Sequence, residues 1–261
     1  FRSLETPTLL GLRFVRERSC PYLPGRTERT LAAPLPPLRA AEILDAACRA
    51  GFRRSQSYVY RPACRGCAAC VPVRVLADSF VWSRSWRRIL KANGDLTGET
   101  RSSRATPEAF ELFHRYQLQR HGASGMGAMT YSDFRAMVED SPAPASLIEH
   151  RRADGRLMAV LLADRVSDGW SAVYSFFDPD SAHRSLGTYM ILDLVRRSHA
   201  ERRPFVYLGY WIELSPKMAY KARFSPLQAL SADGWQPIAS LRSEEHTSEL
   251  QSRLHLVCRL L

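Results

Sequence analysis

The spacing of apolar residues predicts alternating helices and strands in the first hundred residues. Apolar positions recur at helical spacing from Leu38 to Ala50, and Gly51 follows as a stop. A basic segment, residues 82–92, has helical character and ends at Asn93-Gly94. Between these two helices, the predicted strands are short and flank a cysteine-rich loop: residues 57–60 and 71–75.

The second part of the chain continues with helix and strand patterns. Thr106-Pro107-Glu108 combines an N-cap, a proline at the first helical position and an early acid, which predicts a helix to about Gln119. Ser132 is expected to cap another short helix. Three strands separated by Asp-Gly turns, a helix and a buried strand then follow: residues 147–150, 157–163, 170–177, 187–200 and 205–209.

This order of three antiparallel strands, a helix and a further strand resembles the core of the acyl-CoA N-acyltransferases, the GNAT fold. In that fold the acyl donor binds where neighbouring strands splay apart. We therefore expect an α+β protein with a small N-terminal cysteine-bearing domain, residues 1–100, and a GNAT-like C-terminal domain, residues 101–241. Residues 242–261 read as a non-native tail and are excluded from the predicted fold. Fold alone does not give the reaction.

The charge of the chain adds a candidate partner. Its 261 residues carry 37 Lys and Arg against 26 Asp and Glu, a net charge of +11, which favours a polyanion such as nucleic acid. A basic surface kept for solubility would give the same composition. Six cysteines are too few for a disulfide scaffold, and no apolar run approaches the roughly 20 residues of a membrane helix. We therefore expect a cytoplasmic protein with no membrane partner.

Four cysteines form a candidate metal site. Cys64, Cys67 and Cys70 are each separated by two residues, and Cys20 supplies a fourth thiol. Zinc or an iron–sulfur cluster would suit four thiolates. The alternative is a set of small buried or redox-sensitive side chains. Cys48 falls on the apolar side of its predicted helix and is assigned to the core.

The loop before the helix at 187–200 is a candidate anion site. Free backbone N–H groups and the helix dipole point outward where a glycine turn opens a helix. Arg184 and Gly187 fit the Arg-x-x-Gly part of the acetyl-CoA pattern. Tyr189 stands where that pattern has a small residue, and we expect its ring to crowd a pyrophosphate. A plain helix cap is the alternative.

Residues 207–221 hold four aromatic side chains and two lysines just after a predicted core strand. Aromatic rings can stack on an exposed base and lysines can hold phosphates, and an unpaired tRNA 3′ end presents both. Aromatic core residues beside solvated lysines would give the same pattern.

Several segments, in order along nearly the whole body of the chain, resemble the bacterial aspartate/glutamate leucyltransferases, which are relatives of the arginyl-tRNA–protein transferases. In one departure, Ser215 stands before Pro-Lys-Met where relatives often have cysteine, so either a catalytic thiol is not required there or this copy is altered. The matching segments are residues 20–26, 51–55, 60–70, 91–96, 155–160, 171–180, 185–187 and 207–221.

The resemblance implies transfer of leucine from leucyl-tRNA to proteins with an N-terminal Asp or Glu, which marks them for N-end-rule degradation. The aminoacyl ester is already activated, so no cofactor is required for transfer. The residues expected to act in catalysis are Tyr174, Asp178, Tyr207 and Tyr210. Those expected to bind substrate are Ser175, Arg184, Gly187, Lys217, Tyr220 and Lys221.

Three other functions fit parts of the pattern. An arginyl-tRNA–protein transferase would share the matching segments. A CoA-dependent N-acetyltransferase would share the predicted fold, although Tyr189 counts against it. A non-catalytic RNA-binding module with a zinc knuckle would share the cysteines and the charge, but it would not need the strand–helix–strand half.

Overall fold

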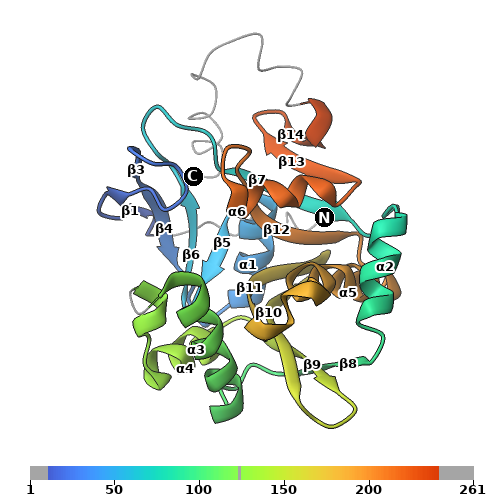
Figure 1. Cartoon of the computed structure of the whole chain (residues 1–261). Coiled ribbons are helices and arrows are strands. Elements are labelled where there is room, and N and C mark those ends of the chain that lie inside the picture. Colours follow the sequence, from blue (N-terminus) through green and yellow to red (C-terminus); the bar gives the residue numbers. More distant parts are fainter. Residues whose placement is uncertain (1–10, 123–124, 241–261) are drawn as a thin grey trace.

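The computed structural model describes residues 11–122 and 125–240, so the proposed tail at 242–261 lies outside the described residues. The described chain is built around an eight-stranded sheet in the order β14-β13-β7-β12-β11-β10-β9-β8 (Figure 1). Its strands are β7 (Val71–Leu76), β8 (Leu96–Ser102), β9 (Ala145–Arg152), β10 (Leu157–Val166), β11 (Gly169–Phe177), β12 (Phe205–Trp211), β13 (Leu227–Ser231) and β14 (Gly234–Pro237).

The N-terminal part forms a smaller sheet in the order β1-β4-β6-β5, with a separate β2-β3 pair. Helix α1 (Ala40–Arg49) buries its apolar stripe between this sheet and the large one. The strands are β1 (Arg13–Phe14), β2 (Arg18–Ser19), β3 (Thr27–Glu28), β4 (Thr30–Pro34), β5 (Arg53–Ser55) and β6 (Tyr58–Pro62).

The other helices are distributed over the two faces of the large sheet (Figure 1). They are α2 (Arg84–Ala92), α3 (Pro107–His121), α4 (Tyr131–Glu139), α5 (Leu186–Ala200) and α6 (Pro216–Ala219), with 3-10 turns η1 (Gly125–Ala128), η2 (Pro179–Arg184) and η3 (Tyr220–Arg223). Every helix in the described ranges is too short or too polar to cross a bilayer.

Strand β10 shows how the two faces are used. Successive side chains of a strand point to opposite faces. Leu161 and Ala163 belong to the core under α5 and α2, whereas Val160 and Leu162 belong to the core under α3 and α4. Val166, further along on the second face, packs in the core of the N-terminal part. The N-terminal part and the α3–α4 pair therefore lie side by side on one face, and α5 and α2 cover the other.

A buried ion pair joins the N-terminal part to the large sheet. Both Arg54 and Asp164 have side chains with 0% exposure, and Arg54 Nη2 lies 2.7 Å from Asp164 Oδ1. Arg54 Nε donates to both carboxylate oxygens, at 2.9 and 2.8 Å. Removing one member of a buried pair leaves an uncompensated charge. Arg54 belongs to the N-terminal part and Asp164 to the large sheet, so this ion pair fixes one part against the other.

The α+β class and the order β9-β10-β11-α5-β12 confirm the prediction. The predicted helices correspond to α1, α2, α3, α4 and α5. The predicted cap at Ser132 is wrong, because Thr130 accepts the N–H of Asp133 at 3.2 Å while the Asp133 side chain accepts the N–H of Thr130. This reciprocal pair is a capping box. Strand β7 precedes the proposed boundary at residue 100 and β8 runs across it, and both strands pair within the large sheet.

Candidate functional site

Strands β11 and β12 diverge at the centre of the large sheet. Their parallel pairing runs from Gly169–Phe205 to Ser171–Tyr207, after which β11 continues to Phe177 and β12 to Trp211. The register of β12 against β7 also shifts between Tyr207 and Gly209. This opening corresponds to the position where GNAT-like folds are expected to hold their acyl donor.

Arg53 of β5 occupies the opening. Its Nη2 donates to the carbonyl of Val173 at 3.0 Å and to that of Ala172. Gly209 makes this approach possible, since its φ is +75° and a Cβ there would lie 2.6 Å from Arg53 Nη1. Arg53 Nη1 is buried and has no partner in the described chain. A cation from the N-terminal part therefore fills the space between the two strands.

Lys221 lies beside this opening and is 8% exposed. Its Nζ donates to the carbonyl of Tyr210 at 2.7 Å and lies 3.8 Å from the sulfur of Met218. No carboxylate of a described residue pairs with it. Burial, followed by the nearby charge of Arg53, lowers the pKa of Lys221 to about 7. A buried ammonium normally has a carboxylate partner, and the described residues supply none to Lys221.

The Tyr210 hydroxyl links β12 to the N-terminal part, whereas the Tyr207 hydroxyl is bonded within the large sheet. The Tyr210 hydroxyl donates to the carbonyls of Gly51 and Tyr60, at 3.1 and 3.0 Å. The Tyr207 hydroxyl donates to Asp168 at 3.0 Å. Burial raises the pKa of both tyrosines. Both hydroxyls are therefore neutral and engaged in internal hydrogen bonds, and the catalytic roles expected for them stay predictions.

The three expected residues of β11 and its following loop differ in their surroundings. The Tyr174 hydroxyl accepts the amide N–H of Gln117 at 2.6 Å, and burial raises its pKa. Ser175 is partly buried and pairs with Leu161. Asp178, 1% exposed, accepts from several donors: Arg115 at 2.8 Å, Arg156 at 3.1 Å and Ser181 at 2.9 Å. Its carboxylate is therefore saturated with hydrogen bonds.

The loop before α5 docks α5 onto α2. Arg184 donates to the Asn93 side chain at 3.0 Å, to the Ala92 carbonyl at 3.1 Å and to Asp95. Gly187 permits close packing, because a Cβ there would lie 3.2 Å from the ring of Phe177. These contacts give both residues a structural use, and their expected role in substrate binding stays a prediction.

Tyr189 does not have the position expected for it. The side chain is 5% exposed and packs edge-on against His150 of β9, with ring centroids 5.2 Å apart. Its ring is therefore directed into the core and does not fill the loop as predicted. The side chain that lies in the β11–β12 opening is Arg53.

Lys217 and Tyr220 lie at the surface beside Lys221. Lys217 is exposed on α6, and Tyr220 is 39% exposed. Burial raises the pKa of Tyr220, and the charges of Arg120 and Arg53 oppose that rise. The structure thus brings Tyr220 and Lys221 close to Arg53, while the hydroxyl of Tyr174 is turned toward α3.

The four cysteines are neighbours in the N-terminal part. Burial, followed by charge on the other three thiols, raises the pKa of Cys70 to about 12. Arg26 Nη1 donates to Cys67 at 3.1 Å, and the Arg29 N–H donates to Cys64 at 3.4 Å. N–H donors to sulfur also tune thiolate metal centres. However, across the described ranges no three His, Cys, Asp or Glu side chains are grouped closely enough to hold a metal ion.

Cys48 confirms its assignment to the core. It is 2% exposed within the cluster formed by α1 and the small sheet. Burial raises the pKa of its thiol to about 12.

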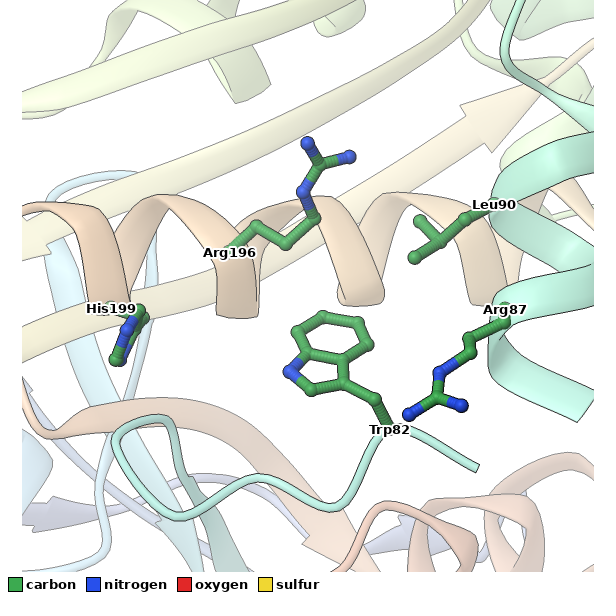
Figure 2. Close-up of a pocket in the computed structure, with 5 residues that line it drawn as sticks. All are labelled: Trp82, Arg87, Leu90, Arg196 and His199. Carbon is green, nitrogen blue, oxygen red and sulfur yellow. The ribbon is translucent and has the colours of Figure 1, made fainter. Parts of the chain in front are cut away.

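A hollow that none of these site residues lines lies between α2 and α5 (Figure 2). It measures about 400 Å³ and is lined by Trp82, Arg87, Leu90, Arg196 and His199. Neither Arg53 nor Lys221 is among the residues that line this hollow.

Comparison with known proteins identifies the family. Two family models match: "Arginine-tRNA-protein transferase, N terminus" over residues 18–88 and "Arginine-tRNA-protein transferase, C terminus" over residues 108–231. An aspartate/glutamate leucyltransferase of Paramagnetospirillum magneticum is 53% identical over 220 residues, covering 84% of this chain and 90% of its own. The chain belongs to the aspartate/glutamate leucyltransferase family.

A further relative agrees with this assignment. An aspartate/glutamate leucyltransferase of Granulibacter bethesdensis is 45% identical over 230 residues, covering 88% of this chain and 86% of its own. Among solved structures, the chain is similar to a fungal GCN5-related glucosamine N-acetyltransferase region, with a TM-score of 0.39 and 9% identity over 61% of this chain and 19% of that one.

Within this leucyltransferase family member, Arg53 is the site residue that sequence reasoning missed. It lies in a segment that resembles the family, but nothing local indicates where its side chain goes. The available signal was Gly209, a glycine directly after the core of a predicted strand. Such a glycine indicates close approach by another group.

Proposed function

We propose that this chain transfers leucine from leucyl-tRNA to the N-terminal Asp or Glu of acceptor proteins. The observation that carries the proposal is the buried cationic site at the β11–β12 opening, which has Lys221 without a carboxylate partner and Arg53 beside it. The membership of the family supports the donor and the acceptor classes.

The acceptor side chain accounts for the open cation. An acidic first residue would place its carboxylate against Lys221, giving the buried ammonium the anion that the described chain lacks. The adjacent Arg53 adds positive potential. Asn or Gln at the first position would leave the ammonium unpaired, so the site favours acidic acceptors.

The chemistry requires positioning more than activation. The acceptor amine, with a pKa of about 8, has a neutral fraction at neutral pH. Its lone pair attacks the ester carbonyl, the new N–C bond forms, and the C–O bond to the terminal ribose breaks. The proton of the amine passes to the departing ribose oxygen. Holding both substrates in contact supplies much of the rate enhancement.

Acetyl-CoA is a weaker candidate for the donor. Arg53 occupies the opening between β11 and β12, and the Gly209 backbone lies against its guanidinium. A pantetheine arm would have to displace this side chain and its hydrogen bonds to the Val173 and Ala172 carbonyls. The geometry therefore favours a donor that reaches the site by another path.

The cysteines are proposed to hold zinc or an iron–sulfur cluster in the N-terminal part. Four neighbouring thiols and two N–H···S contacts support this, although their present spacing does not form a metal cage. A bound group would fix the loop beside the acceptor site, and no step of the transfer runs through it.

The test is a transfer assay with purified protein. Radiolabelled leucine should pass from leucyl-tRNA to peptides that begin with Asp or Glu, and not to matched peptides that begin with Ala. Arginyl-tRNA and acetyl-CoA serve as competing donors. Transfer from acetyl-CoA alone would overturn the proposal, and transfer from arginyl-tRNA alone would keep the reaction class but change the donor.

A further inference from the structure

The hollow between α2 and α5 has a composition that the transfer site does not explain. Trp82 is partly buried, contacts Phe80 edge-on with ring centroids 4.7 Å apart, and stands between the two helices (Figure 2). Arg87 and Leu90 come from α2, and Arg196 and His199 come from α5. The hollow thus combines an accessible indole with basic side chains on both sides.

The basic side chains around the hollow are not neutralised. Arg87 and Arg196 are exposed, and their side chains form no hydrogen bond or ion pair with any described residue. Three more exposed basic side chains without described ion pairs extend this surface along α2, at Arg84, Arg88 and Lys91. Between Arg84 and Ala92 the helix has no acidic residue. At the rim, His199 Nδ1 lies 3.5 Å from Asp78.

We infer that this surface binds the body of the tRNA, with an unpaired base against Trp82 and the adjoining phosphates at Arg87 and Arg196. The inference rests on the proposed function, in which tRNA is the donor. Bases that are free of a duplex are recognised by stacking on aromatic side chains, and arginines hold the backbone. About 400 Å³ is a volume typical of small-ligand clefts.

The position of the hollow makes it a second contact, distinct from the transfer site. None of the residues that line the hollow belongs to the site formed by Arg53 and Lys221. The hollow also opens on the face of the sheet opposite Arg53. It therefore increases donor affinity without touching the reacting atoms.

The test compares two double charge reversals in the full chain. Arg87→Glu with Arg196→Glu alters the hollow. The control, Arg104→Glu with Arg135→Glu, alters two exposed arginines near α3 and α4 that also lack described ion pairs. Each pair changes the net charge by 2 × (−2) = −4, from +11 to +7. A difference between them reports a local contact rather than the overall field.

Binding of uncharged leucine-accepting tRNA is measured at increasing salt. The hollow variant should lower the slope of log affinity against log salt by about 1.4–1.8, as loss of two phosphate contacts implies. The control should keep the wild-type slope. Trp82→Leu, which keeps an apolar side chain in the hollow, should weaken binding roughly 5- to 150-fold through loss of stacking.

In the transfer assay, the hollow variant should raise the KM for leucyl-tRNA and leave kcat and the acceptor KM unchanged. Equal tRNA binding by the hollow variant, the control and Trp82→Leu would overturn the inference, as would equal loss in both charge reversals. Capture of an acidic protein with no change in tRNA binding would assign the surface to another partner. Wild-type protein that binds tRNA through this surface but transfers no leucine would instead refute the proposed function.

Discussion

Replacement of Lys221 by Met is the sharpest test of the acceptor site. Met has a similar length and removes the ammonium without adding a polar atom to a position that is 8% exposed. The substitution removes the hydrogen bond to the Tyr210 carbonyl, but it also removes a buried charge that has no carboxylate partner, so the variant should fold. Lys217→Met is the matched control, because it removes one positive charge from an exposed position on the same segment.

The expected loss follows from the carboxylate contact. A hydrogen bond to a charged group contributes about 1.5–3 kcal/mol. At 1.36 kcal/mol per decade, the KM for Asp and Glu peptides should rise roughly 13- to 160-fold in Lys221→Met. The KM for leucyl-tRNA should stay unchanged, since the lost contact belongs to the acceptor. Lys217→Met should leave the acceptor KM within twofold of the wild type.

The assay measures transfer to peptides that differ only in the first residue, Asp, Asn, Glu or Gln. Wild-type protein should prefer the acid over its amide, and Lys221→Met should largely lose this preference. If Lys221→Met keeps the wild-type preference, the acidic side chain does not pair with Lys221. An equal rise in KM for acids and amides would mean that the substitution changed the shape of the site rather than its charge.

The pH profile provides an independent measurement on Lys221. Its pKa of about 7 means that the ammonium is present below pH 7 and is lost as the pH rises through that value. The KM for acidic acceptors should therefore increase above pH 7, while deprotonation of the acceptor amine near pH 8 favours attack. The kcat/KM profile should be bell-shaped between these values. Lys221→Met should lose the alkaline decline, and a decline that persists in this variant would assign it to another group.

Three further substitutions test other contacts. Gly209→Ala should lower Tm and reduce transfer, because its Cβ would meet Arg53 at 2.6 Å. The control Gly155→Ala, at φ +86° with open space around it, should show only the backbone cost of about 1–3 kcal/mol. Equal effects of the two substitutions would contradict the role of Arg53. Arg54→Leu should lower the free energy of unfolding by about 3–5 kcal/mol, and adding Asp164→Leu should recover part of it; no recovery would mean that packing, not charge, dominates. Cys70→Ser should release zinc or iron from anaerobically purified protein if the cysteines hold a metal, whereas metal-free wild-type protein with full activity would refute the metal site.

The elements of the fold were predictable because their signals are local. Helix α3 begins where Thr106, Pro107 and Glu108 indicate, and the core strands follow runs of apolar residues. The cap of α4 was misplaced by two residues, since Thr130 and Ser132 both carry a hydroxyl. Asp133, three residues after Thr130, distinguishes them by completing the capping box.

The candidate site was predictable as a region but not as a set of contacts. The sequence indicated residues 207–221, and Lys221 proved to be buried beside the strand opening. Burial and the nearby charge of Arg53 lower the pKa of Lys221. Arg53 in turn donates to carbonyls about 120 residues away in the chain. No local sequence pattern indicates a contact between residues so far apart in the chain. Arg184 shows the converse, since an arginine at a helix start suggested an anion although Asn93 and Asp95 on a distant turn were its partners.

The position of β7 has a consequence for synthesis on the ribosome. This strand pairs with β12 on one side and β13 on the other, and β12 begins about 130 residues later. While the chain emerges from the ribosome, the backbone groups of Val71, Val73 and Val75 lack these sheet partners until β12 and β13 have been synthesised. Such late pairing is slow, and in the meantime the unpaired apolar strand can pair with another chain. A nascent chain that stops before β12 is therefore expected to aggregate or be degraded rather than persist as a folded fragment.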